Sequence, residues 1–184
     1  MVKTNIELIL GEIEAVFRSL NENQVSELCG EILQAKKIVV CGAGRVGMAI
    51  RGFGMRLGHL GLQAFTLGDS VVPSIGKGDL LLVASGSGET QTIYDLVEIA
   101  KKNGARIGLV TGNPESRMGK LADVCVQIKA PSKTKAVEGL TSIQPMTTLN
   151  EQSLGIFFDA LVLDLMEKME ETHDTMWARH SNLE

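Results

Sequence analysis

The chain has 184 residues, a length that suits one domain with a well-buried core. Its formal net charge is -4 with 22% charged residues, so it lacks the basic field that binding to nucleic acid or to an anionic membrane surface requires. Any anionic ligand must therefore be bound by a local site. The longest apolar stretch, 156–166, is interrupted by two aspartates, which argues against a span across a membrane.

Residues 1–36 are predicted to form a helical hairpin. Apolar residues recur at helical spacing over 6–20 and again over 25–33, on either side of a polar break at 21–23. The first residues lead into an acidic amphipathic segment, which is not the pattern of a secretory signal peptide.

The three cysteines, Cys29, Cys41 and Cys125, are an odd number and contain no CxxC pair. This usage favours small core residues of a reduced, cytoplasmic protein over a disulfide framework. The three histidines and three cysteines also lack the spacing of metal ligands, so no metal site is expected.

Residues 37–129 alternate between short apolar runs and helix-length segments. Strands are expected at 38–41, 63–67, 80–84, 106–110 and 124–128, and helices at 48–60, 90–102 and 116–121. Strands that are apolar on both faces and alternate with helices predict a doubly wound α/β fold with a five-stranded parallel sheet. The connection over 68–78 leaves room for only about one helical turn around Pro73.

Residues 130–184 are expected to form a loop, a long helix and a tail. The helix begins near Thr148, runs to about Glu170 and is apolar on more than one face, so it should be sandwiched within the fold or against a second subunit. We therefore expect an oligomer. The polar connection over 130–146, which includes Lys133, Lys135 and Glu138, has a length typical of a lid.

Two glycine-rich turns follow expected strands, where ligands collect in an open parallel sheet. The first, GAGRVG at 42–47, fits the dinucleotide pattern G-x-G-x-x-G, with Asp69 near the place of a ribose-binding acid. The chain has little length left for a dehydrogenase's substrate domain, however, and Arg45 stands where a pyrophosphate needs close approach to the backbone. Dinucleotide binding also leaves the second turn unexplained.

The second turn, SGSGET at 85–90, suits a phosphate monoester. Its two glycines let backbone N–H groups surround a small anion, and its three hydroxyls add donors at a helix N-terminus. In the alternative, Ser87 merely caps the helix and Glu89 interacts favourably with the helix dipole. A cap needs one hydroxyl, so we favour phosphate. The expected ligands are Ser85, Gly86, Ser87 and Thr90.

The pattern S-x-S-G-x-T after the third strand resembles the phosphate loop of sugar isomerase (SIS) domains. Together with GAGRVG, MRLGHLG at 55–61, SIQPMTTLNEQ at 142–152 and RHSNLE at 179–184, it makes the chain similar to the 6-phospho-3-hexuloisomerase family. The resemblance covers nearly the whole chain. It implies a single SIS domain over 1–184 with the flavodoxin-like strand order.

The resemblance also implies an activity, namely the interconversion of D-arabino-3-hexulose 6-phosphate and D-fructose 6-phosphate through a cis-enediolate, in the ribulose monophosphate pathway. Members of the family need no cofactor or metal and are usually tetramers. The family typically has serine where this chain has Val46. Contacts of the first loop with substrate are therefore expected from Gly44 and Arg45.

Glu151 is the candidate base for the proton transfer beside the carbonyl, because a carboxylate suits that step. Thr148 and Glu151 also have the spacing of a capping box, in which the glutamate would only accept a hydrogen bond from the backbone. The match to the SIS pattern favours catalysis. Arg45 would hold a substrate hydroxyl, the phosphate or an enediolate oxygen. The alternative is that Arg45 is a surface residue without a functional role.

His180 exchanges protons near neutrality, so it would assist the sugar oxygens or open the furanose ring. The alternative is a frayed tail. Trp177, just upstream, would anchor the tail by packing, in this chain or in a neighbouring subunit's cleft. His59 is expected to be structural, near the end of its helix, and His173 to be exposed.

Two other functions remain open on the sequence alone. An aldose–ketose isomerase would use the same loop and base to move a proton between C1 and C2 of another sugar phosphate. A non-catalytic SIS module would bind a sugar phosphate as a sensor, although such a module is normally joined to a DNA-binding domain for which this chain has neither length nor charge.

Overall fold

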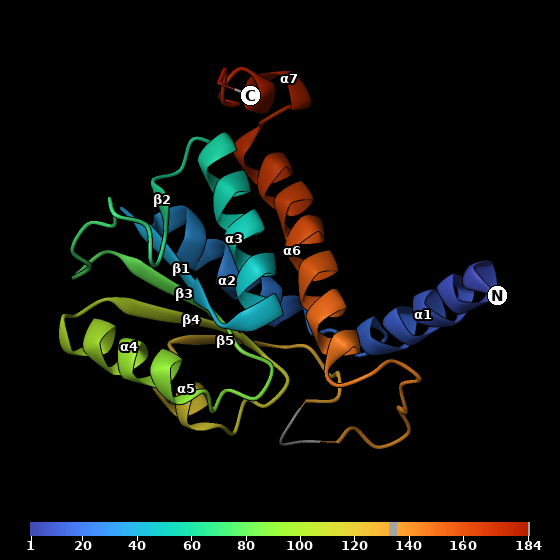
Figure 1. The fold of residues 1–184 in the computed structure, drawn as a ribbon. Coiled ribbons are helices and arrows are strands. Elements are labelled where there is room, and N and C mark those ends of the chain that lie inside the picture. The colour runs from blue at the N-terminus through green and yellow to red at the C-terminus, as the bar shows by residue number, and fades with distance from the viewer. Residues whose placement is uncertain (133–135, 184) are drawn as a thin grey trace.

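A five-stranded parallel sheet forms the middle layer of the protein, seen in a computed structural model that describes residues 1–132 and 136–183 (Figure 1). The strands pair in the order β2-β1-β3-β4-β5, all parallel. Their bounds are β1 Ile38–Gly42, β2 Ala64–Thr66, β3 Leu80–Ala84, β4 Arg106–Thr111 and β5 Val124–Gln127. This arrangement confirms the doubly wound fold and the flavodoxin-like order.

Helices cover both faces of the sheet because successive strand residues point to opposite sides. Val40 and Leu82 belong to a core shared with α2 (Glu22–Gln34), α3 (Gly44–His59) and α6 (Thr148–Met169). Val39 and Leu81 belong to a second core, shared with α4 (Gln91–Lys102) and α5 (Arg117–Leu121). The apolar runs of the sequence thus reflect strands that are buried from both sides.

The long helix α6 packs against α3, where the rings of Phe53 and Phe158 stack with centroids 4.9 Å apart. It also contacts α1 and α2, which explains why it is apolar around so much of its circumference. The expected long helix is therefore confirmed, and its apolar faces are covered largely within the fold.

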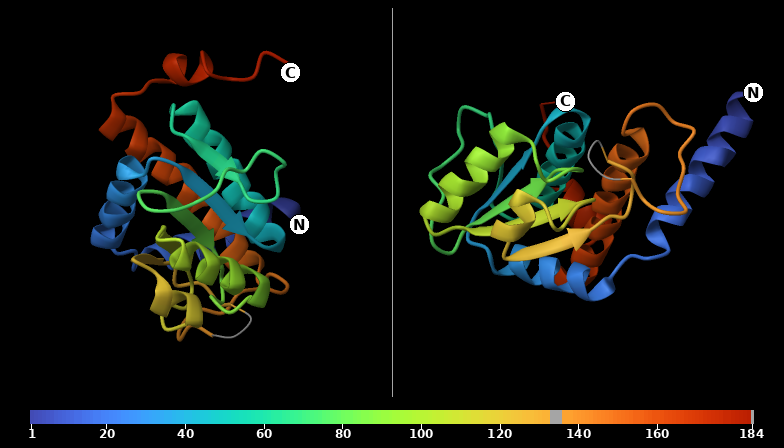
Figure 2. Two further views of the ribbon diagram at one scale, coloured as in Figure 1. Left: turned by 90° about the vertical axis from the view of Figure 1, so that its left-hand side faces the viewer. Right: turned by 90° about the horizontal axis from the view of Figure 1, so that it is seen from below.

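The two N-terminal helices form where they were expected, but they do not fold back on each other as a hairpin. The helix α1 (Val2–Phe17) points away from the sheet, and only its second half, with Ile13 and Val16, is buried (Figures 1 and 2). Asn21 separates the two helices and caps α2, because its Oδ1 accepts hydrogen bonds from two backbone N–H groups of the first turn.

Two connections were singled out from the sequence, the one between β2 and β3 and the expected lid over 130–146. No helical turn forms around Pro73, where the chain between β2 and β3 makes turns only. In the expected lid, Lys133 and Lys135 lie outside the described residues, and Glu138 belongs to a turn closed by a bridge between Val137 and Leu140. None of the helices in the described chain is both long and apolar enough to cross a membrane.

Candidate active site

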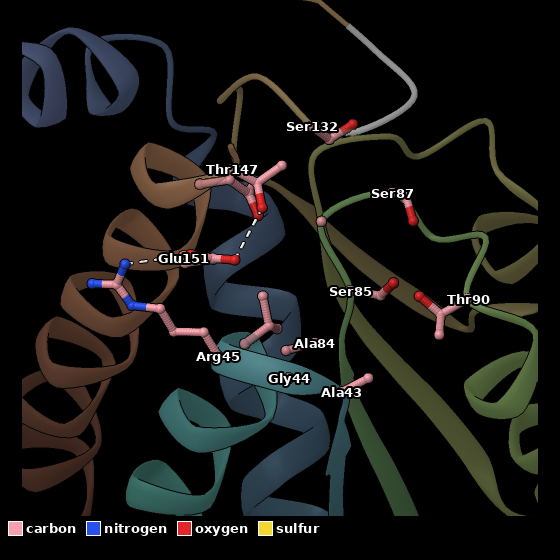
Figure 3. Close-up of a pocket in the computed structure, with 13 residues that line it drawn as sticks. Ala43, Gly44, Arg45, Ala84, Ser85, Ser87, Thr90, Ser132, Thr147 and Glu151 are labelled. Carbon is pink, nitrogen blue, oxygen red and sulfur yellow. Dashed lines mark hydrogen bonds and ion pairs between the residues drawn. The ribbon is translucent and has the colours of Figure 1, made fainter. Parts of the chain in front are cut away.

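A cavity of about 200 Å³ lies at the carboxyl ends of β1 and β3, against the first turn of α6 (Figure 3). The two glycine-rich turns therefore open into one space, as the parallel sheet requires. The lining residues are Ala43, Gly44, Arg45, Val46, Ala84, Ser85, Gly86, Ser87, Thr90, Ser132, Thr147, Asn150 and Glu151.

The loop 85–90 is held in a tight turn by its own polar groups. The backbone N–H of Gly88 donates to the hydroxyl of Ser85 at 3.1 Å, and Gly88 has a φ of 66° that favours glycine. Ser87 accepts a hydrogen bond from the N–H of Glu89 and does not cap α4, whose N-cap residue is Thr90. The capping alternative for Ser87 is therefore wrong, and the hydroxyls gather on one side of the cavity (Figure 3).

Glu89 fixes the back of this loop to the neighbouring helix α5 and lies before the first turn of α4. Its carboxylate accepts from the backbone N–H of Arg117 at 2.9 Å and from the Nε of the same residue at 2.8 Å. The guanidinium also donates to the carbonyl oxygen of Glu89 at 2.8 Å. These hydrogen bonds from Arg117 lower the pKa of the Glu89 carboxyl.

The first glycine-rich turn brings α3 directly against β1. Gly44 has a φ of 59°, and a Cβ on Gly47 would lie 2.6 Å from the carbonyl oxygen of Gly42. Only glycine permits this approach. The turn places Arg45 and Val46 at the cavity, whereas Asp69, the candidate ribose ligand of a dinucleotide site, is not among the lining residues.

Glu151 faces the cavity from the first turn of α6, with 19% of its side chain exposed. One carboxylate oxygen accepts from the Thr147 hydroxyl at 2.9 Å, and the other lies 3.4 Å from Nη1 of Arg45 (Figure 3). The alternative for Glu151, a capping box with Thr148, is not formed, because Thr147 occupies the N-cap and Thr148 donates its hydroxyl proton to the carbonyl of Pro145. A carboxylate and a guanidinium thus stand opposite the hydroxyl-rich loop.

A protein-family comparison matches residues 31–154 to the SIS domain. The chain belongs to the SIS domain family. This confirms the resemblance inferred from the phosphate loop and from the segments around it.

Two relatives match this SIS domain over nearly their whole length. The protein named 3-hexulose-6-phosphate isomerase from Bacillus subtilis is 36% identical, with 96% of this chain and 95% of the relative covered. The protein of the same name from Mycobacterium gastri is 39% identical, with coverage of 100% and 92%.

A solved structure supports the same relationship. The crystal structure of a hypothetical protein from Methanococcus jannaschii, for which a function of 3-hexulose-6-phosphate isomerase was inferred, superposes with a TM-score of 0.85. It is 28% identical in sequence, and the match covers 98% of this chain and 99% of the other. The shared fold therefore extends through the helices at both ends.

The cavity brings together the candidate residues for isomerisation and for phosphate binding, with the exception of His180. The His180 ring lies 5.2 Å from that of His59, at the end of α3 remote from Gly44. Because α3 spans about 22 Å between those two ends, His180 does not reach the cavity of its own chain. Trp177 stacks on His180 with centroids 5.0 Å apart and remains 65% exposed, so it does not anchor the tail in this chain's core.

Three polar residues of the cavity were not predicted, namely Ser132, Thr147 and Asn150. Ser132 follows β5, whose carboxyl end lies at the same edge of the sheet as those of β1 and β3. Its place in the sequence could therefore have predicted that it lies near the cavity. Thr147 and Asn150 flank the start of α6, where only the position of the helix reveals which side chains face inward. Among the described residues, no group of histidines, cysteines and carboxylates is placed to hold a metal ion.

Proposed function

We propose that this SIS domain is a cofactor-independent isomerase that interconverts D-arabino-3-hexulose 6-phosphate and D-fructose 6-phosphate. One observation carries the proposal. A carboxylate, Glu151, and a loop suited to phosphate, 85–90, share one cavity of about 200 Å³. The names of relatives that match over nearly their whole length support this particular substrate pair.

The phosphate of the substrate would be held by the loop 85–90. Backbone N–H groups at the start of α4 carry partial positive charge, and the hydroxyls of Ser87 and Thr90 add donors without a fixed charge. Gly44 and Gly86 leave the backbone open to the ligand on both sides of the cavity. Anchored there, the sugar chain would extend toward Glu151 and Arg45.

Glu151 would act as the base. Starting from fructose 6-phosphate, it takes the proton from C3, the electrons form the double bond of a cis-enediolate, and the proton returns to C2 as the carbonyl moves to C3. Thr147 orients the carboxylate, and Arg45 stabilises the negative charge that develops on the substrate oxygens. The reaction moves a proton and a carbonyl within one molecule, with no net change in oxidation state.

His180 is part of the proposal as a proton-transfer residue that acts in the cavity of a neighbouring copy. Its distance from the cavity of its own chain and the exposed Trp177 beside it support this assignment. The assembly would be a homo-oligomer, a tetramer by family resemblance. Mixing Glu151→Gln and His180→Asn variants, each inactive alone, should restore part of the activity. If no mixture is active, His180 does not act in the cavity of a neighbouring copy.

A place in the ribulose monophosphate pathway and a cytoplasmic location complete the proposal. Three cysteines, Cys29, Cys41 and Cys125, are free thiols in the structure, which is the usual state of cysteines in a reducing compartment. Sugar phosphates are also cytoplasmic metabolites as a class, since their charge prevents passive escape through a membrane.

The proposed function is tested by NMR of D-fructose 6-phosphate incubated with the purified protein in D₂O, without added metal or nucleotide. Deuterium at C3 supports the 3-hexulose isomerase. Deuterium at C1 would assign an aldose–ketose isomerase instead. No exchange, with the sugar phosphate still bound, would favour a non-catalytic binding module.

A further inference from the structure

Glu12, on the second half of α1, is bonded to the segment that leads into α6, 130 residues further along the chain. Its Oε2 accepts hydrogen bonds from the hydroxyl of Ser142 at 2.7 Å and from Nε2 of Gln144 at 3.0 Å. Its Oε1 accepts a hydrogen bond from the backbone N–H of Ile143 at 2.7 Å. One carboxylate thus holds three consecutive residues of a loop that lies beside α1 (Figure 2).

These hydrogen bonds favour the charged form of Glu12. Burial alone would raise the pKa of this carboxyl, but the hydrogen bonds from the three loop residues outweigh it and lower the pKa from the ordinary value. Hydrogen bonds to a carboxylate are stronger than those between neutral groups. The contact between Glu12 and the loop 142–144 is therefore charge-assisted at neutral pH.

The chain then turns into α6 through a residue in a strained conformation. Met146 has a φ of 58°, in the left-handed region that residues other than glycine rarely adopt. Its side chain is 90% exposed, so packing does not offset the strain. Such a conformation persists where the contacts around it impose it. Those contacts are the hydrogen bonds of Glu12 before the turn and, across it, the two from the hydroxyl and N–H of Thr148 to the carbonyl of Pro145, at 2.7 and 3.3 Å.

Thr147 follows this turn and contacts the candidate base. Its hydroxyl donates to the carboxylate of Glu151 at 2.9 Å, and its carbonyl oxygen accepts from the backbone N–H of Glu151 at 3.0 Å. Only two residues separate Thr147 from Gln144, the last residue that Glu12 holds. One of the two is a proline, whose ring fixes φ. A displacement of the loop would therefore be passed on to Thr147 and to the base.

We propose that Glu12 is a positioning residue, which holds the loop 142–144 so that Thr147 orients the carboxylate of the base. This inference rests on the proposed isomerase function. Glu12 is not among the described residues that line the cavity, so it acts through the loop and contacts no substrate atom. The helix α1 thereby contributes to catalysis although it points away from the sheet.

The experiment compares Glu12→Gln with the unaltered protein. Glutamine keeps the shape of the side chain, but it replaces one of the two accepting oxygens by a donor. We expect kcat with fructose 6-phosphate to fall by about tenfold or more, since a displacement of about 1 Å at a reacting group costs about 100-fold. The KM and the inhibition constant of inorganic phosphate should stay within about twofold, because the loop 85–90 is unchanged. Amide hydrogen exchange over 142–147 should accelerate.

The matched control is Glu14→Gln, the same change at an exposed glutamate of α1 that pairs with Arg18 on the same helix. Its kinetics and its hydrogen exchange should equal those of the unaltered protein. Ser142→Ala removes one of the three donors to Glu12 and should lower kcat in the same direction by a smaller factor. It decides the matter if Glu12→Gln fails to fold.

A second variant tests the route through the turn. Met146→Asn, added to Glu12→Gln, should recover part of the lost kcat, since asparagine adopts the left-handed region at lower cost than methionine. A double variant no faster than Glu12→Gln would show that the effect does not pass through this turn, and it would overturn the proposal.

Unchanged kcat in Glu12→Gln would also overturn the proposal, even with faster hydrogen exchange, because Glu12 would then hold the loop without positioning the base. So would an inhibition constant of phosphate that rises in step with the fall in kcat, because the whole cavity would then be disturbed. Absence of C3 exchange in the unaltered protein in D₂O would instead overturn the proposed isomerase, and the positioning role with it.

Discussion

Glu151 reaches the cavity because Thr147, and not Thr148, is the N-cap residue of α6. Had Thr148 been the N-cap, the carboxylate would have turned back to the backbone, as in a capping box. Instead the hydroxyl of Thr147 donates to one of its oxygens at 2.9 Å, and Arg45 lies near the other. The carboxylate is oriented by two side chains and lines the cavity.

Glu151→Gln tests the role of this carboxylate directly. Glutamine keeps the shape and can still accept from Thr147, but it cannot take a proton, so kcat should fall by at least about 100-fold. Binding of inorganic phosphate, measured by calorimetry, should be unchanged. Glu98→Gln, at an exposed position bonded to Tyr94 on α4, is the control. Retained turnover in Glu151→Gln would assign the base to another group.

At the level of elements, the loop 85–90 is shaped by the helix α5 beside it. Gly88 lies so close to α5 that a Cβ there would come 1.9 Å from the hydroxyl of Ser116. The guanidinium of Arg117 on α5 links the loop to α4. It donates a hydrogen bond to Glu89 and lies 4.3 Å from the ring centroid of Tyr94. The loop therefore depends on a packed neighbour as well as on its own sequence.

Arg117→Ala should loosen the loop while leaving the base in place. We expect KM for the sugar phosphate and the inhibition constant of phosphate to rise together by about fivefold to tenfold, from the loss of charge-assisted hydrogen bonds at a partly exposed site. The value of kcat should change little. Lys102→Ala, a charge removed from the end of α4, is the control. If kcat falls and phosphate binding does not change, the Glu89–Arg117 pair affects the chemistry and not the loop.

The tail is fixed to the end of α3 by a second pair, Glu171 and Arg179. The guanidinium donates to both carboxylate oxygens at 2.8 Å and to the carbonyl of His59 at 2.9 Å. The hydrogen bonds from Arg179, with another from Thr175, lower the pKa of Glu171 to about 2. A carboxyl whose pKa is lowered by folding stabilises the tail above its ordinary pKa of 4.5 and loses that effect as pH falls toward 2.

Trp177, the only tryptophan, should report this loss. We expect its fluorescence to change between about pH 4.5 and pH 2, ahead of the far-UV circular dichroism, because the tail detaches before the core unfolds. In Glu171→Gln the tail should already be detached at pH 7, so the early step disappears. Coincident fluorescence and dichroism transitions in both proteins would show that the pair does not hold the tail.

Much of the element pattern was predictable because it depends on local sequence. The strands and most helices were located to within a few residues, since burial from both sides leaves uninterrupted apolar runs. The loop 85–90 was identified from its own glycines and hydroxyls. The direction of α1 was not predictable, because an apolar stripe does not reveal whether its partner is the next helix or α6.

The remaining parts of the site could be predicted only from the fold of the whole molecule. Asn150 is buried only because Gly86 and Gly112, from two other elements, meet at its amide. The capping box between Thr148 and Glu151 does not form, because Thr147 is the N-cap residue of α6. The catalytic role of His180 stays a prediction, because its distance from the cavity depends on the course of the tail, which no local pattern specifies.

The projecting helix α1 bears on the assembly of the whole molecule. Its buried residues Ile13 and Val16 continue toward the N-terminus as an apolar stripe, yet Ile6 is 51% exposed and Leu10 57% exposed. A stripe of this kind on a helix that leaves the body is typical of a contact with another chain. A second copy of this protein is the partner that the proposed oligomer supplies.

Ile6→Glu should therefore reduce the mass of the assembly measured by light scattering after size exclusion, since it places a charge in the apolar contact. Asn5→Glu adds the same charge at the neighbouring polar position of α1 and should leave the mass unchanged. If His180 acts in a neighbouring copy, kcat should fall with the loss of assembly in Ile6→Glu and recover at high protein concentration. A mass equal to that of the unaltered protein would show that α1 makes no contact between copies.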